Sequence, residues 1–203
     1  MSVIAKKPEG PGILTPEGTC QAVCYGVWDI GIQKISWNGM DKPVHKVVIG
    51  WEINEKIDMP ESEYHGKPYV ISNRYTLSLS EKSNLYKHLT SWRGKPFTKE
   101  ELDGFDLEKL IGANCMLNVV HNEVGERVYA NISGIMRLPK GMPSIIPETP
   151  HDPPQWVKFL QNNQYDVSKS PKNDDFLPSD FPPPEREQYQ PPERNPYEND
   201  PNY

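Results

Sequence analysis

The chain of 203 residues is long enough for one domain and an additional segment, and its formal net charge is −6. Residues 1–140 hold 17 Lys and Arg and 17 Asp and Glu, whereas residues 141–203 hold 5 and 11, so the C-terminal segment carries all of the net charge. Three cysteines, no apolar N-terminal core of secretory length and no run of about 18 apolar residues argue against a disulfide scaffold, secretion and a membrane span. We therefore expect a soluble, cytoplasmic protein.

The first part of the chain predicts a loose arm followed by three strands. Residues 1–18 contain three Pro and three Gly and predict a flexible N-terminal arm. Thr19–Ile35 is rich in β-branched and aromatic residues, with two glycines at places suited to bends, which favours a long, curved first strand. Alternating apolar residues predict a second strand over Val44–Ile53 and a third over Pro68–Leu79.

A helical connection and two further strands follow. Ser80 is suited to cap the first helix, and Thr98–Glu101 forms a capping box for a second, shorter one. The apolar face of the first helix is formed by Leu85, Leu89 and Trp92. Ala113–His121 and Arg127–Arg137 predict the last two strands, on either side of a short turn.

This element order is typical of an OB-fold, a small Greek-key barrel that often binds oligonucleotides, although other five-stranded barrels share it. We predict a mainly β protein: a five-stranded OB-fold-like barrel in residues 19–141, with the helical connection between strands 3 and 4. Residues 142–203, which hold 14 of the 22 prolines, predict an acidic and mostly disordered tail. Within it, the apolar island Gln155–Leu160 is either a docking motif or one turn packed on the barrel.

The sequence shows no motif for catalysis or metal binding. Its five histidines have no metal-ligand spacing, and neither a phosphate loop nor a nucleophile elbow occurs. Asp29, Glu52 and Asp106 are carboxylates that a fold can bring together around a magnesium ion, but no pattern selects them. Cys20 and Cys24 are typical of small core residues. We predict no catalytic residues, no bound metal and no cofactor.

Cations interleaved with aromatic residues favour binding of single-stranded DNA, in which cations follow the phosphates and bases stack on aromatic rings. The candidate DNA-binding residues lie opposite the apolar strand faces, in the first hairpin and around the helix: Lys34, Trp37, Lys46, Arg74, Lys82, Lys87, Arg93, Lys95, Phe97, Arg127, Tyr129 and Arg137. Such a mixture is also typical of a hydrophobic core with a solvated rim. The acidic tail can cover a basic groove, recruit replication or recombination proteins, or keep the protein soluble.

Two stretches of the chain resemble a known family: RYTLSLSEKSNLYKHLTSWRGKPFTKEELDGFDLEKLIGANCMLNVVH (residues 74–121) and YANISGIMRLPKG (residues 129–141). They are similar to the single-stranded DNA-binding proteins that tailed bacteriophages and prophages encode among replication and recombination genes. The resemblance implies a non-catalytic DNA-binding protein, a monomer or an oligomer, in the cytoplasm of a bacterial host, with no membrane partner. It implies no particular DNA-contacting residues. The alternative is a phage adaptor or inhibitor that uses the same fold and tail for protein contacts alone.

Overall fold

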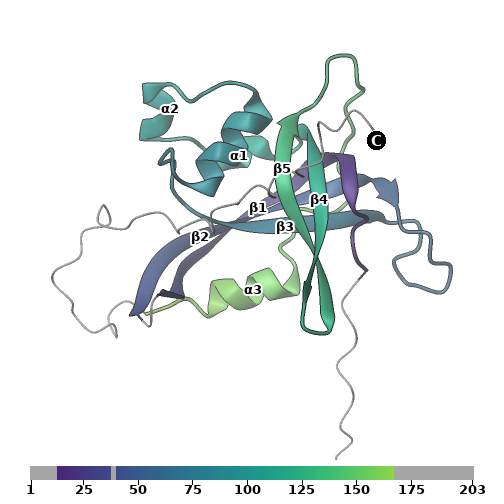
Figure 1. Cartoon of the computed structure of the whole chain (residues 1–203), viewed down its shortest axis with the longest axis horizontal. Coiled ribbons are helices and arrows are strands. Elements are labelled where there is room, and N and C mark those ends of the chain that lie inside the picture. The colour runs from purple at the N-terminus through teal and green to yellow at the C-terminus, as the bar shows by residue number, and fades with distance from the viewer. Residues whose placement is uncertain (1–12, 38–39, 167–203) are drawn as a thin grey trace, which may run out of the picture. The chain divides into compact units, whose positions relative to one another are not determined.

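The computed structural model describes residues 13–37 and 40–166, which form a mainly β domain (Figure 1). Its strands are β1 (Gly18–Trp37), β2 (Met40–Lys56), β3 (Pro68–Thr76), β4 (Asn114–Val124) and β5 (Arg127–Arg137). They form one antiparallel sheet in the order β3-β2-β1-β4-β5. The prediction of a mainly β domain with five strands is confirmed.

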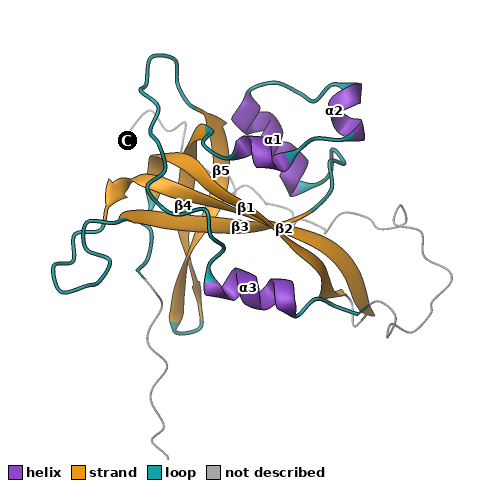
Figure 2. Cartoon of the chain, turned by 180° about the vertical axis from the view of Figure 1, so that it is seen from behind, coloured by secondary structure: helices purple, strands orange, loops and turns teal. Residues whose placement is uncertain are grey.

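Three α-helices and one short 3-10 helix complete the described part of the chain (Figure 2). They are α1 (Asn84–Arg93), α2 (Lys99–Asp103), η1 (Leu107–Leu110) and α3 (Gln155–Asn162). α1 begins later than predicted, because the Ser83 hydroxyl, rather than that of Ser80, accepts the hydrogen bond from Tyr86 N at 3.1 Å. Thr98 caps α2 through the predicted capping box with Glu101. None of the described helices is long and apolar enough to cross a membrane.

The sheet is not closed into the predicted barrel, because its edge strands β3 and β5 form no hydrogen-bonded ladder. α1 packs against both edge strands, and the Ser91 hydroxyl donates to the Ile135 carbonyl of β5 at 2.6 Å. Thr15 links β3 to β4: its hydroxyl donates to the Val70 carbonyl at 3.1 Å, and its carbonyl lies 2.8 Å from His121 Nε2. α1 and part of the predicted N-terminal arm therefore link the two ends of the sheet, whose edge strands approach each other without pairing.

One face of the sheet encloses the main hydrophobic core together with α1. The buried strand residues of this core are Ala22, Cys24, Val47, Ile49, Trp51, Ile53, Ile71, Tyr75, Cys115, Leu117, Val119 and Ile135. The predicted apolar face of the helix is confirmed, since Leu85, Leu89 and Trp92 are all buried against them. This core fixes the inner face of the sheet, so any ligand has to bind elsewhere.

The opposite face of the sheet, called the outer face below, is partly covered by the chain that follows β5. Val157 of α3 is fully buried there. It packs with Tyr25, Trp28, Ile30 and Val48. Residues 142–166 thus extend the folded unit beyond the boundary predicted at residue 141, because the apolar island packs on the sheet instead of remaining in solvent. The rest of the predicted tail, residues 167–203, lies outside the described residues.

Candidate nucleic-acid interface

Two cations from neighbouring strands meet on the outer face. The register of β2 and β3 pairs Lys46 with Thr76 and places Arg74 two residues before Thr76. Strand alternation then puts Lys46 and Arg74 on the same side of the sheet as the buried Val48. The Lys46 ammonium donates to the Thr76 hydroxyl at 2.9 Å. The Arg74 guanidinium lies 5.7 Å from the centre of the Trp156 ring, a cation–π contact with the first turn of α3.

Lys46, Arg74 and Trp156 together are called the outer-face cluster. Burial lowers the pKa of the Lys46 ammonium below its ordinary value, and the like charge of Arg74 lowers it further. Within the described part of the chain, no ion pair joins Lys46 or Arg74 to a carboxylate. An anion placed between them would offset their mutual repulsion. The Trp156 ring, in a residue that is 40 % exposed, offers a flat apolar surface beside these charges.

Trp156 is the member of this cluster that sequence reasoning missed. The sequence places it in the predicted tail, within the apolar island that predicts either a docking motif or a packed turn. A signal was present in the helical spacing: Val157 and Leu160 form one apolar pair at i and i+3, and Trp156 and Phe159 form another. In the structure the first pair packs on the sheet, whereas Trp156 and Phe159 remain exposed.

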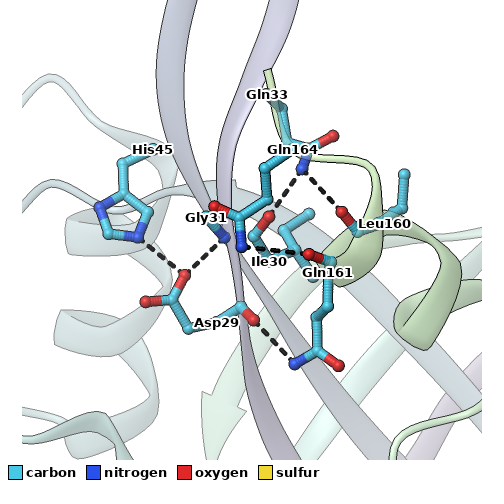
Figure 3. A network of polar contacts seen from close by, with 8 residues as sticks. All are labelled: Asp29, Ile30, Gly31, Gln33, His45, Leu160, Gln161 and Gln164. Carbon is cyan, nitrogen blue, oxygen red and sulfur yellow. Dashed lines mark hydrogen bonds and ion pairs between the residues drawn. The ribbon is translucent and has the colours of Figure 1, made fainter. Parts of the chain in front are cut away.

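α3 is held against a bulge of β1 by the polar network shown in Figure 3. The bulge lies between Asp29 and Gly31, where the register with β2 shifts. The Asp29 carboxylate accepts from the Gly31 N–H at 2.7 Å and lies 2.7 Å from His45 Nε2. Gly31 has a φ of 65°, and a Cβ there would overlap the side chain of Gln164. Glycine at this position therefore allows both the bulge and the close approach of the chain after α3.

Two glutamines complete the attachment of α3 to this bulge (Figure 3). The Gln161 side chain donates to the Asp29 carbonyl at 2.9 Å. The Gln33 side chain of β1 donates to the Leu160 carbonyl at 3.3 Å. Because these bonds join parts of the chain that are distant in sequence, they fix the position of α3 and hence that of Trp156.

Arg93 and Phe97, both predicted to contact DNA, lie in the packing between α1 and α2. The Arg93 side chain is 13 % exposed and forms an ion pair with Glu101. Its guanidinium lies over two rings, 4.2 Å from the centre of Phe97 and 5.1 Å from that of Phe105. Phe97 is itself buried in the main core. These contacts give both residues a structural role in the turn after α1.

The remaining predicted residues are spread over the described surface. Lys34 forms an ion pair with Asp41 across the β1–β2 hairpin, and the backbone of Trp37 ends β1. Exposed side chains around α1 and near the β4–β5 turn are Lys82, Lys87, Lys95, Arg127 and Tyr129. Arg137, at the end of β5, lines a pocket of about 380 Å³ beside Trp92. The register of β2 and β3 thus brings Lys46 and Arg74 together on the outer face.

The three carboxylates considered for a metal site have separate partners. Asp29 bonds to the β1 bulge, Glu52 accepts two backbone N–H groups from the chain after β5, and Asp106 caps η1. Among the described residues, no group of three or more His, Cys, Asp or Glu is arranged to hold a metal ion. Burial raises the pKa of Cys20 to about 11 and that of Cys24 to about 12, so these thiols stay protonated at neutral pH.

The outer-face cluster suits a ligand that combines negative charge with flat rings. A phosphate placed against Lys46 and Arg74 would neutralise two cations, and a base placed against Trp156 would cover its exposed ring. No protein-family model matches the chain, and no curated protein matches it either.

Proposed function

We propose that this protein binds single-stranded DNA and catalyses no reaction. The observation that carries the proposal is the outer-face cluster, in which two neighbouring cations adjoin an exposed indole ring. Proteins bind single strands through cations that follow the phosphates and aromatic rings on which bases stack. Lys46 and Arg74 supply the cations, and Trp156 supplies the aromatic ring.

The strand order supports an OB-type fold for this function. Pairing β3 with β5 in the order β3-β2-β1-β4-β5 would give a five-stranded Greek-key barrel with α1, α2 and η1 between the third and fourth strands. OB-folds have this element order, are partly open and bind oligonucleotides across strands 2 and 3. Lys46 belongs to β2 and Arg74 to β3, so both lie on the strands that this mode of binding uses.

The family resemblance over the run from Lys67 to Gly141 supports a role in bacteriophage replication or recombination. In that role the protein would coat single strands as they become exposed in the bacterial cytoplasm. Residues 167–203 are acidic, so they oppose the charge of the outer-face cluster. This segment would weaken DNA binding by competition or, once released by DNA, recruit replication and recombination proteins.

Fluorescence anisotropy of a labelled oligo-dT tests the proposed function. We expect the wild-type protein to bind the oligonucleotide at low salt and to bind duplex DNA more weakly, since paired bases cannot stack on an indole. Arg74→Ala and Trp156→Ala should each weaken binding roughly tenfold, the size expected from losing a charged contact or one stacked base. Lys99→Ala removes an exposed cation of α2 and is the matched control, whose affinity should equal that of the wild type.

Two results of this titration would contradict the proposal. The first is the lack of any binding by the wild-type protein at low salt, both for the full chain and for a chain that ends at residue 166. The second is binding that Lys99→Ala weakens as much as Arg74→Ala does, because that would indicate general charge attraction without a defined site.

The exposed aromatic residues of α3 favour a second candidate function, that of a phage adaptor or inhibitor. Phe159 is 63 % exposed and follows Trp156 by three residues on the same helix. Exposed aromatic side chains of this kind are enriched in protein interfaces. Under this alternative, the wild-type protein would fail to bind oligo-dT, and Phe159→Ala would weaken association with a host or phage protein.

A further inference from the structure

The Trp28 indole lies over two glycines on the outer face of the sheet. A Cβ at Gly26 would lie 2.0 Å from Trp28 Cζ2, and a Cβ at Gly50 would lie 2.9 Å from Trp28 Cη2. Gly26 of β1 and Gly50 of β2 are paired across the two strands. Any side chain at either position would displace the ring. Glycine at both positions therefore lets the indole pack directly against the backbone.

A second aromatic ring stacks against this indole. The His151 imidazole stacks on Trp28 with the ring centres 6.1 Å apart and the planes inclined by 24°. The Trp28 Nε1–H donates to the His151 carbonyl at 2.9 Å, and His151 Nδ1 lies 3.1 Å from the Tyr25 carbonyl. Trp28 is almost completely buried by this ring together with Tyr25, Val48 and Val157, whereas His151 remains exposed to solvent. His151 thus has the position that a stacked base would occupy on a tryptophan.

The covered indole lies in the same row of the sheet as the outer-face cluster. Trp28 pairs with Val48, and Val48 pairs with Arg74, so the three residues cross β1, β2 and β3 side by side. Adjacent strands lie about 4.8 Å apart, which puts the backbone of Trp28 roughly 10 Å from that of Arg74. Val48, between them, is buried under Val157 of α3, so a single strand held at Arg74 would pass over this segment to reach the indole.

We infer that Trp28 is a further stacking position for a nucleobase and that His151 occupies it until DNA arrives. This inference rests on the proposed function. It adds a second contact to a base and a side chain that controls access to that contact. Binding at Arg74 brings a base to the imidazole, which swings into the solvent that it already faces. The base then takes the stacked position on Trp28.

The segment around His151 is anchored in a way that permits this exchange. Glu52 is buried in β2, and its carboxylate accepts the backbone N–H groups of Glu148 and Thr149 at 2.8 and 2.7 Å. On the other side of His151, Val157 fixes α3 to the sheet. The imidazole therefore projects from a short link between two fixed points, and its side chain can move without release of α3.

Oligo-dT titration of His151→Ala tests the inference. Removal of the imidazole should open the Trp28 ring and tighten binding roughly three- to tenfold, the change expected when a competing aromatic stack is lost. His65→Ala is the matched control: His65 lies in the loop between β2 and β3, near Asp58, and its loss should leave affinity unchanged. Thermal unfolding of both variants verifies that they are folded.

Photocrosslinking gives the second measurement. An oligo-dT that carries 5-iodouracil should crosslink to the peptide containing Trp28, more strongly in His151→Ala than in the wild type. If His151→Ala binds as the wild type does, or more weakly, and the Trp28 peptide carries no crosslink, the inference is wrong although the proposed function stands. If neither protein binds oligo-dT, the proposed function fails and this inference fails with it.

Discussion

Lys46 has a position that favours anion binding at a cost in stability. Its ammonium is half-buried beside the Arg74 guanidinium, and burial and this like charge lower its pKa below the ordinary value of 10.5. The unfolded chain restores the ordinary pKa, so the charged lysine destabilises the folded protein at neutral pH. This destabilisation declines as the pH rises toward 10.5, because Lys46 loses its proton at a lower pH in the folded protein than in the unfolded chain.

Lys46→Met should therefore stabilise the protein while it weakens DNA binding. Methionine keeps an apolar chain of similar length and removes the charge. We expect the free energy of unfolding in urea to rise by less than about 1 kcal/mol, since solvent screens a half-exposed ammonium. The affinity for oligo-dT should fall roughly tenfold. Lys99→Met is the control for both quantities, and a Lys46→Met protein that loses stability and keeps full affinity would count against this account of the cluster.

His88, which lies beside the core residue Tyr75, provides a separate pH dependence. His88 Nδ1 lies 2.9 Å from the Tyr75 hydroxyl, and the two rings pack edge to face. Burial lowers the pKa of His88 below its ordinary value of 6.5 and raises that of Tyr75. The folded protein thus keeps this imidazole neutral. Below pH 6.5 the unfolded chain binds the proton first, so stability falls as the pH is lowered.

Urea unfolding at a series of pH values tests this assignment. The wild-type protein should lose stability from neutral pH toward acid, and His88→Gln should lose less over the same range, because glutamine has no proton to gain. The carboxylates, which also titrate toward acid, are common to both proteins and cancel in the comparison. His65→Gln, in an exposed loop, should follow the wild type. Parallel curves for His88→Gln and the wild type would exclude His88 as the source.

At the scale of elements, α3 changes where the folded unit ends. Its Val157 is fully buried on the outer face, and Glu52 binds the preceding segment through two backbone N–H groups. A chain that ends at Asp166 should unfold at the same urea concentration as the full chain. A chain that ends at Gly141 should lose about 3 kcal/mol or more, because it exposes the apolar cluster under α3. Equal stability of the two truncated chains would contradict this assignment of the boundary.

Features that depend only on residues within one or two helical turns of each other were predictable from the sequence. The capping box of Thr98 and Glu101 and the apolar face of α1 depend on neighbouring residues alone. Strand faces depend on distant partners. In β5, strict alternation would put Met136 in the core, but a bulge opposite Asn118 shifts the register, so that Ile135 is buried and Met136 is 47 % exposed.

The candidate site was predictable only where it depends on neighbouring residues in the sequence. Lys46 and Arg74 alternate with apolar residues in their own strands, which is a local signal. Trp156 was not predictable, because its place depends on the docking of α3 at the β1 bulge. Arg93 and Phe97 share one short segment, and their structural role depends on the ion pair between Arg93 and Glu101 after the turn. Composition of that segment alone could not separate packing from binding.

At the scale of the described domain, the two faces of the sheet have different roles. The inner face and α1 form the core, α1 also contacts both edge strands, and Thr15 bonds to β3 and β4. The outer face carries the proposed interface: cations on β2 and β3, Trp156 beside them, and the covered Trp28 on β1. Binding would thus proceed on a surface that the protein's own chain has already partly covered.

The salt dependence of oligo-dT binding tests whether the outer face binds single-stranded DNA. For single strands, the logarithm of the binding constant falls with the logarithm of salt by about 0.7 per neutralised phosphate. We predict a wild-type slope that corresponds to several phosphates, and a slope for Arg74→Ala that is smaller by about one contact, with Lys99→Ala equal to the wild type. A wild-type protein that does not bind at low salt, or a slope that Arg74→Ala leaves unchanged, would contradict the claim that the outer face binds single-stranded DNA.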